Sequence, residues 1–219
     1  GSVNFENQNP WPVTFKEPGC MGWYNYMPIM ECYHGILSMH HSLSGSLSLN
    51  NSQVDFNDGI GYTEKDWGKN FPKSWIWVQA NHFRKNKISL SASRARIPLL
   101  GTQFAGFIIG LLIEDKFYRF TTYRSSKINH LSFKKDKIEW VVKQKELTLK
   151  IFISLGEKTG LLFAPDSKDM IEKVEEHLDS KVRFILEKNS KIIFEDESDF
   201  AASEVVGDIE ALLKLANSN

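Results

Sequence analysis

Two carboxylates, Glu64 and Asp66, stand two positions apart in a stretch that alternates like a β-strand. On a strand, residues i and i+2 share a face and lie about 6.5–7 Å apart. Tyr62 belongs to the same face, whereas Trp67 belongs to the opposite face. Neighbouring carboxylates in a dry site raise one of the two pKa values, which makes that group a proton donor. The alternative is that both charges form salt bridges at a barrel rim.

The next predicted strand has an unusual face that combines indoles with amides. Alternation separates an aliphatic face from a second face formed by Trp75, Trp77, Gln79 and Asn81. Buried amides need hydrogen-bond partners, which a plain apolar core does not supply. This face therefore indicates a pocket in which a ligand or ordered water satisfies the amides. The alternative is an exposed face whose two indoles are half covered by loops.

The stretch before these strands, residues 18–40, contains further polar residues that could belong to a functional site. Cys32, His34 and His40 could be imagined as metal ligands, but they fall on one long strand without the second ligand pair of a structural zinc site. We therefore expect no metal. Glu31 and His34 are candidate pocket residues instead, and His82 is a further candidate for ligand contact. The sequence contains none of the usual nucleotide-binding, zinc-protease or α/β-hydrolase motifs.

The composition excludes several classes of protein. With 27 basic and 27 acidic residues the formal net charge is +0, so we expect no nucleic-acid partner. The longest apolar stretch, residues 97–113, contains several glycines and is shorter than the about 20 residues that a spanning helix needs. Two strands joined by a turn fit it better. Cys20 and Cys32 are predicted to be free thiols in a reducing compartment, which favours a soluble, cytoplasmic protein with at most peripheral membrane contact.

The elements that must position these residues are mostly strands. Residues 35–49 alternate between apolar and polar positions, and turn-like linkers separate the strands that follow. Further strands are predicted at residues 74–83, 87–95, 105–113, 117–123, 138–144, 147–154, 182–187 and 192–195. Two helices are predicted from their apolar faces, one after Pro165 with Met170, Ile171, Val174 and Leu178, and one at the C-terminus with Ile209, Leu212, Leu213 and Leu215.

Many short-linked strands with few helices predict a mainly β, antiparallel meander. Closing it into a barrel is the cleanest way to remove exposed edges. Residues 3–219 are expected to form a single domain, because neither a repeat nor a linker interrupts them. Gly1 and Ser2 look like the remnant of a protease cleavage site and are left out of the fold prediction.

The sequence resembles the tocopherol cyclase family through nearly its whole length. The matching pieces are residues 18–24, 30–35, the block from Gly61 to Phe83, residues 106–107, 118–120, 164–165 and 204–207. The central block is the most specific, because it holds many aromatic and charged positions. The resemblance implies a lipocalin-like β-barrel that acts on prenyl-chain substrates without a metal, nucleotide or redox cofactor. Family members usually carry an additional N-terminal stretch, so early barrel strands could be missing here.

The reaction that this resemblance implies closes a chromanol ring by adding a phenol oxygen across a prenyl double bond. Glu64 or Asp66 would supply the proton, and His34, His82 or the second carboxylate would take the proton of the phenol. The remaining candidates would stabilise the carbocation (Trp67, Trp75 or Trp77) or orient the hydroquinone hydroxyls (Gln79 and Asn81).

Two other functions use the same sequence features. A non-catalytic, lipocalin-like carrier or sensor of a quinone, prenol or similar lipid needs the same aromatic pocket. A carrier would tolerate loss of its carboxylates with little change in affinity, whereas an enzyme would lose product formation and still bind. A structural interaction domain would bind no apolar ligand at all.

Overall fold

Two antiparallel sheets make up the computed structural model, which describes residues 1–85, 87–99, 102–166 and 169–215. The smaller sheet is built around β2 (Cys32–Leu49), which pairs with β1 (Ser2–Glu6), β3 (Ser52–Asp55) and β4 (Gly59–Gly68). Asn50 and Asn51, between β2 and β3, both have positive φ, as a tight two-residue hairpin turn requires. Ser2, which the fold prediction left out, is part of β1 and pairs with Ser46.

The larger sheet runs in the order β8-β7-β6-β5-β14-β13-β11-β10-β9, and β12 pairs with β13 beside this path. Its strands are β5 (Ser74–Ala80), β6 (Ile88–Leu99), β7 (Thr102–Ile113), β8 (Lys116–Thr121), β9 (Lys127–Lys134), β10 (Lys137–Gln144), β11 (Leu147–Ser154), β12 (Lys158–Asp166), β13 (Asp169–Lys188) and β14 (Lys191–Gly207). Every pairing is antiparallel. The predicted mainly β, antiparallel fold is therefore confirmed.

The predicted closed barrel is not found among the described residues. The paired path ends at β8 and at β9, which follow each other in the chain but do not pair. The 3-10 helix η2 (Thr122–Arg124) and Ser125, which has a positive φ, stand between them in place of a hairpin turn. The connection therefore leads the chain away from β8 before β9 begins, and the sheet stays open.

The helix predicted after Pro165 is wrong. That segment forms the end of β12 and the start of β13, while residues 167 and 168 lie outside the described residues. Of the predicted apolar helix face, Val174 is buried, whereas Met170 and Leu178 are exposed. β13 pairs with β12 on one side and with β14 on the other. Hairpin pairing with β12, together with pairing to β14 from Glu176 onward, therefore overrides the local helical pattern, as tertiary context often does.

The predicted C-terminal helix is confirmed as α1 (Ile209–Lys214). The side chain of Asp208 accepts a hydrogen bond from the Ala211 N–H and so caps the helix, and Leu212 is fully buried. No helix in the described part of the chain is long and apolar enough to cross a membrane. The apolar stretch at residues 97–113 belongs instead to β6 and β7, as the strand interpretation expected.

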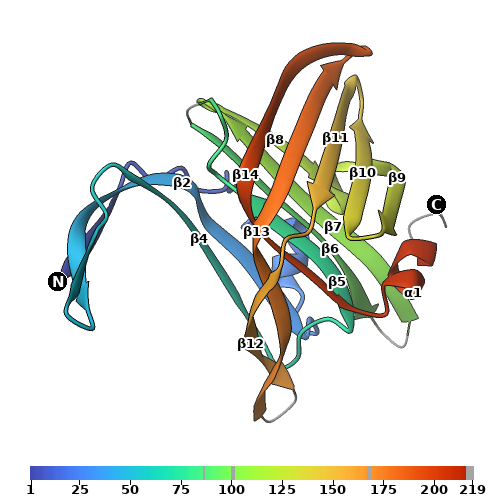
Figure 1. Cartoon of the computed structure of the whole chain (residues 1–219). Coiled ribbons are helices and arrows are strands. Elements are labelled where there is room, and N and C mark those ends of the chain that lie inside the picture. Colours follow the sequence, from blue (N-terminus) through green and yellow to red (C-terminus); the bar gives the residue numbers. More distant parts are fainter. Residues whose placement is uncertain (86, 100–101, 167–168, 216–219) are drawn as a thin grey trace.

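Two apolar cores join these elements. The larger core lines the curved larger sheet and includes Ile76 and Val78, which confirms that the aliphatic face of β5 is buried. The smaller core joins the loop before β2 to β2 and β7, through Trp11, Met39 and Leu112. Figure 1 shows β2 and β4 arching away from the larger sheet toward the N-terminus, with α1 at the opposite side of the molecule. The smaller core therefore holds the inner part of the arch against the larger sheet.

The larger core predicts a clear difference between two phenylalanines on neighbouring strands. Phe184 on β13 is completely buried, whereas Phe200 on β14 is 67% exposed. We expect Phe184→Ala to lower the free energy of unfolding by about 3–5 kcal/mol, because it removes buried area and leaves a cavity. Phe200→Ala, the matched control, should change it by no more than about 0.5 kcal/mol. Urea unfolding followed by tryptophan fluorescence measures both free energies of unfolding. Equal decreases for the two variants would show that Phe184 is not part of the core.

Candidate active site

A cavity lies where the two sheets meet. Strands β5, β6 and β14 of the larger sheet form one wall, and β2 and β4 of the smaller sheet form another. The strand register places Glu204 of β14, Trp77 of β5 and Ser93 of β6 in one row across the first wall. The alternation predicted for β5 is therefore what turns its indoles toward the second sheet.

The second wall carries a hydrogen-bonded group of His34, Glu64 and Asp66, which we call the acid–histidine cluster. His34 and Asp66 are paired positions of the β2–β4 ladder, and His34 Nδ1 lies 2.6 Å from an Asp66 oxygen and 3.6 Å from a Glu64 oxygen. The Tyr62 hydroxyl and the Trp77 N–H (3.2 Å) both donate to Glu64. The Trp77 hydrogen bond therefore ties the two walls together.

Burial and charge shift the pKa values of this cluster in a consistent way. Burial alone would lower the pKa of His34, but the charges of Glu64 and Asp66 and the Asp66 hydrogen bond outweigh it and raise this pKa to about 9. Burial raises the pKa of Glu64, while the positive charge of His34 opposes that rise and the charge of Asp66 adds to it. At neutral pH a protonated His34 therefore sits between two acids.

Glu204 is a third carboxyl group of the cavity, and the sequence analysis did not single it out as a site residue. The N–H of Trp75 donates to Glu204 Oε2 at 2.6 Å. Burial raises the pKa of Glu204 to about 7 against this hydrogen bond, with Glu176 the largest of the neighbouring charges that add to the rise. The only sequence signal for Glu204 was its place in the last stretch of the family resemblance.

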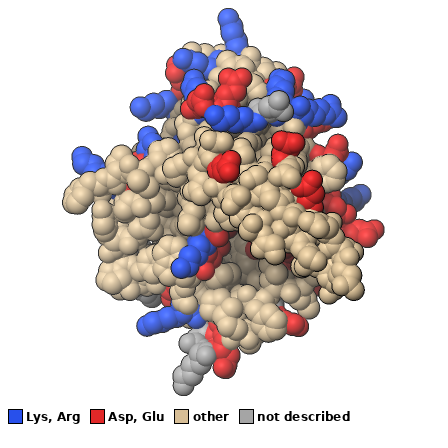
Figure 2. Space-filling model, turned by 90° about the vertical axis from the view of Figure 1, so that its left-hand side faces the viewer, with Lys and Arg blue, Asp and Glu red and all other residues tan. Residues whose placement is uncertain are grey.

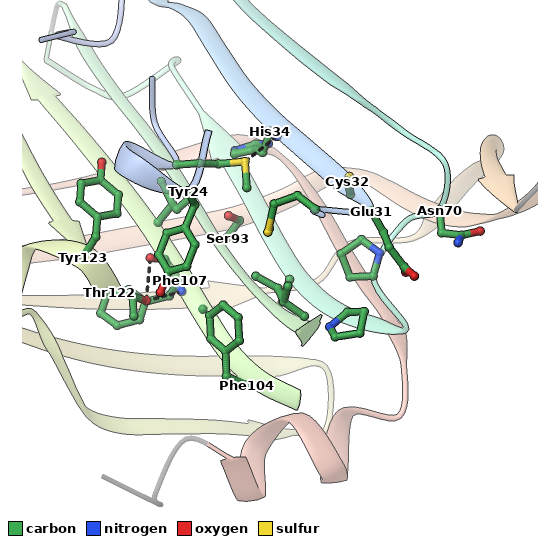
Figure 3. A pocket seen from close by; sticks show the side chains of 18 residues that line it. Tyr24, Glu31, Cys32, His34, Asn70, Ser93, Phe104, Phe107, Thr122 and Tyr123 are labelled. Atoms are coloured by element: carbon green, nitrogen blue, oxygen red, sulfur yellow. Dashed lines mark hydrogen bonds between the residues drawn. The ribbon is translucent and has the colours of Figure 1, made fainter. Parts of the chain in front are cut away.

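An apolar space continues from this polar end. It encloses about 740 Å³ not filled by protein atoms, part of it open to solvent, and it shares His34, Cys32, Ser93 and Ala95 with the polar end. Its other lining residues are mostly apolar or aromatic and include Met21, Tyr24, Met30, Ile97, Phe104 and Phe107. Figure 3 shows Phe104 and Phe107 on one side of this space and His34 and Cys32 on the other, with Ser93 between them. One cavity thus offers a polar end and an apolar end.

The outer surface on the side of the β2–β4 arch is hollowed and carries charges of both signs (Figure 2). Figure 2 shows a hollow in the lower half of this face, with acidic side chains and a lysine or arginine side chain at its edge. Lysine, arginine and acidic side chains are mixed near the upper end of the same face, so no basic patch stands out there.

Cys20 and Cys32 are both free thiols, as predicted from the sequence.

Comparison with known proteins identifies the family. A family model described as tocopherol cyclase-like matches residues 5–207. The chain belongs to the tocopherol cyclase-like family. It is 30% identical over 115 residues to a probable chloroplastic tocopherol cyclase of Oryza sativa subsp. japonica, and 28% identical over 115 residues to a chloroplastic tocopherol cyclase of Zea mays. Each match covers 51% of this chain and 24% of the relative, so the chain matches about a quarter of the length of these proteins.

Five of the residues predicted for the site of this tocopherol cyclase-like chain come together. His34, Glu64, Asp66, Trp75 and Trp77 all line the polar end of the cavity. Each strand face was foreseen from alternation, but their meeting depends on the contact between the two sheets.

Other predicted site residues lie apart from the polar end. Gln79 continues the Trp75–Trp77 face of β5, and its Nε2 is buried without a hydrogen-bond partner among the described residues. The predicted strand face does not reach Asn81, because β5 ends at Ala80. Asn81 is buried and its side-chain oxygen lies 2.8 Å from Nδ1 of His82, whose residue is exposed. Neither Asn81 nor His82 lines the described cavities, so their contact with a ligand stays a prediction.

Glu31 and Trp67 occupy the margins of this region. Glu31 is exposed and lines the apolar end of the cavity near Asn70. Trp67 is on the face of β4 opposite Glu64, as alternation predicted, where it stacks on Tyr33 with ring centroids 5.5 Å apart and is 44% exposed. Trp67 therefore borders a separate surface hollow rather than the cavity that holds Trp75 and Trp77.

The same cluster offers the one arrangement in the described residues that could hold a cation. Ligand-type atoms of His34, Glu64 and Asp66 all lie within 4.8 Å of one another, and neither Cys32 nor His40 joins them. However, His34 Nδ1 already makes a 2.6 Å hydrogen bond to Asp66. A proton therefore lies between His34 Nδ1 and the Asp66 oxygen. A metal could bind these two atoms only after displacing that proton.

The absence of a metal from this tocopherol cyclase-like site is therefore a testable prediction. Treatment of the purified protein with EDTA should leave its melting temperature unchanged, and added Zn²⁺ or Mg²⁺ should not raise it, because the cluster is held by its own ion pair. Differential scanning fluorimetry measures both. A melting temperature that falls with EDTA and recovers with one cation would show that the cluster holds a metal.

The raised pKa of His34 predicts how stability depends on pH. A group whose pKa rises from 6.5 in the unfolded chain to about 9 in the fold contributes stability below pH 6.5 that is lost as the pH rises through about 9. The difference in melting temperature between the wild type and His34→Gln should therefore be largest below pH 6.5 and shrink toward pH 9. His130→Gln, at a half-exposed position, is the control and should have little effect at any pH. A His34→Gln difference that does not change between pH 6 and pH 9 would contradict the assignment.

Proposed function

We propose that this chain is a cofactor-independent cyclase that closes a ring in a prenylated hydroquinone or a related isoprenoid. The observation that carries the proposal is a partly buried acid–histidine cluster that shares the polar end of the cavity with two indoles, next to an apolar space. The aromatic ring of the substrate would lie at the polar end and its prenyl chain along the apolar end. Family membership supports the reaction class, since the two plant relatives are named tocopherol cyclases.

The chemistry needs one proton donor and one proton acceptor. A proton adds to the less substituted carbon of the prenyl double bond, and the π electrons form that C–H bond and leave a tertiary carbocation. A lone pair of the phenol oxygen then forms the C–O bond, and the phenol O–H loses its proton to a base. Substrate and product are isomers, so the balance requires no oxidant or reductant.

The acid–histidine cluster suits the acceptor role. Glu64 and Asp66 accept hydrogen bonds from Tyr62, Trp77 and His34, and such bonds favour ionised carboxylates. A carboxylate of this cluster would take the phenol proton while His34 stays protonated and holds the geometry.

The cavity also supplies the other requirements of the reaction. Its apolar lining keeps water from the carbocation, which water would otherwise trap. The indoles of Trp75 and Trp77 can stabilise positive charge, and each is held by an N–H hydrogen bond to a carboxylate. His34 Nε2 is buried without a partner among the described residues, so a ligand oxygen near it would satisfy a donor.

The second candidate function is a carrier or sensor of the same class of lipid. It is favoured by the volume of the apolar end, which offers space for a prenyl chain without any need for the acids. Such a protein would bind a prenylated hydroquinone and return it unchanged.

Substitution of the two carboxylates tests the cyclase directly. With a prenylated hydroquinone as substrate, Glu64→Gln and Asp66→Asn should each lower turnover by about 100-fold or more, since each removes a proton acceptor while keeping the side-chain shape. Liquid chromatography with mass spectrometry measures the chromanol product. The control is Glu139→Gln, at an exposed position of β10 outside the described cavities, which should keep wild-type turnover.

The outcomes separate the two functions. Wild-type protein whose tryptophan fluorescence is quenched by the hydroquinone, but which forms no product, would be a carrier. Full turnover by either carboxylate variant would remove that residue from the mechanism and leave the other in place.

A further inference from the structure

Glu204 is a carboxyl group of the cavity that the mechanism above does not use. It comes from β14, in the last part of the chain, and lines the polar end from the larger sheet, whereas the acid–histidine cluster lines it from the smaller sheet. Trp75 and Trp77, on the neighbouring strand β5, line the cavity beside it. Two separate carboxyl centres thus border one space.

We infer that Glu204 is the acid that protonates the prenyl double bond, and that the acid–histidine cluster on the other wall accepts the proton of the phenol. This assignment rests on the proposed function. Of the two proton transfers in the proposed reaction, it places one on the larger-sheet wall of the cavity and the other on the smaller-sheet wall. It replaces the expectation that Glu64 or Asp66 supplies the proton.

Hydrogen bonds distinguish the two carboxyl centres. Glu64 accepts from Tyr62 and Trp77 and lies 3.6 Å from the imidazole of His34, and all three neighbours favour its ionised form. Glu204 accepts one hydrogen bond, from Trp75 to Oε2, and its other oxygen has no partner among the described residues. Glu204 therefore accepts fewer hydrogen bonds than Glu64 and has an oxygen free to carry a proton.

Neighbouring negative charges also favour the protonated form of Glu204. Glu176 of β13 and both acids of β4, Glu64 and Asp66, raise the pKa of Glu204, after the larger effect of burial, and this pKa reaches about 7. The protonated His34 of β2 is the one cationic side chain among the described residues lining the polar end, and it is held by the cluster. At neutral pH a carboxyl group with this pKa is protonated in about half of the molecules, and it is a stronger acid than an imidazolium whose pKa is about 9.

The proton transfers balance across the cavity. Glu204 gives its proton to the alkene carbon and becomes a carboxylate next to Trp75 and Trp77, where the carbocation forms. The phenol oxygen bonds to the cationic carbon, and its proton passes to a carboxylate of the acid–histidine cluster. After the product leaves, the cluster releases that proton to solvent and Glu204 takes one up, so the starting state returns.

The deciding experiment compares Glu204→Gln with Glu176→Gln. Glutamine at position 204 can still accept the Trp75 hydrogen bond but cannot donate the proton, so turnover of a prenylated hydroquinone should fall by about 100-fold or more. Affinity for the same hydroquinone, measured by tryptophan fluorescence quenching, should stay close to that of the wild type, which shows that the variant folds. Glu176→Gln is the matched control on the adjacent strand and should keep its maximal turnover.

The pH profile gives a readout that a structural role would not move. Wild-type kcat/KM should fall as the pH rises through about 7, because Glu204 must be protonated. Glu176→Gln should move this fall in kcat/KM to lower pH, since it removes a charge that raises the pKa of Glu204. The residual activity of Glu204→Gln should show no such fall near pH 7.

Three results would overturn the assignment. An active wild type together with a fully active Glu204→Gln would remove this role alone, and so would the loss of the same fall in kcat/KM in Glu64→Gln but not in Glu204→Gln. A wild type that forms no product would instead reject the proposed function, and the assignment with it.

Discussion

The ion pair between His34 and Asp66 is the interaction on which the rest of the site depends. A charge that is partly withdrawn from water, as on His34, is stabilised by an opposite charge close by, and Asp66 supplies one from a position that still contacts solvent. Here the β2–β4 ladder places the two residues opposite each other, and Glu64 lies close enough to share the same positive charge. Trp77 then carries this constraint to the second sheet through its hydrogen bond to Glu64. The cluster therefore fixes both its own strands and the separation of the two walls.

The proposed reaction contains a chemical conflict, which that arrangement would resolve. Protonation of an alkene needs a group that still carries a proton at the working pH, whereas the phenol needs a base, and two such groups in contact would simply exchange the proton. The cavity separates them, because Glu204 is anchored by Trp75 on the larger sheet and the acid–histidine cluster is anchored on the smaller one. The lining of the apolar end offers water few hydrogen-bond partners in the space next to both.

The wrongly predicted helix shows how the fold supports this site. Residues near Ala164 and Val174 form strands of a hairpin, and both side chains pack with Trp75 in a small buried cluster. An amphipathic helix at this position would have buried a different set of side chains. The hairpin therefore contributes to the environment that holds the indole of Trp75 beside Glu204.

Strand alternation alone determined the β-rich class, the aliphatic inner face of β5, the shared face of Glu64 and Asp66, and the opposite placement of Trp67. These features depend only on the two-residue repeat of a strand, which is local. The tertiary structure decided the open sheet, the β12–β13 hairpin, the pairing of His34 with Asp66 and the place of Glu204. Apart from the β12–β13 hairpin, whose strands follow each other in the chain, each of these depends on the register between strands far apart in the chain, and neither composition nor periodicity carries that register. Strand alternation could not place Glu204 in the site for this reason, since the pairing of β14 with β5 brings it to the tryptophans.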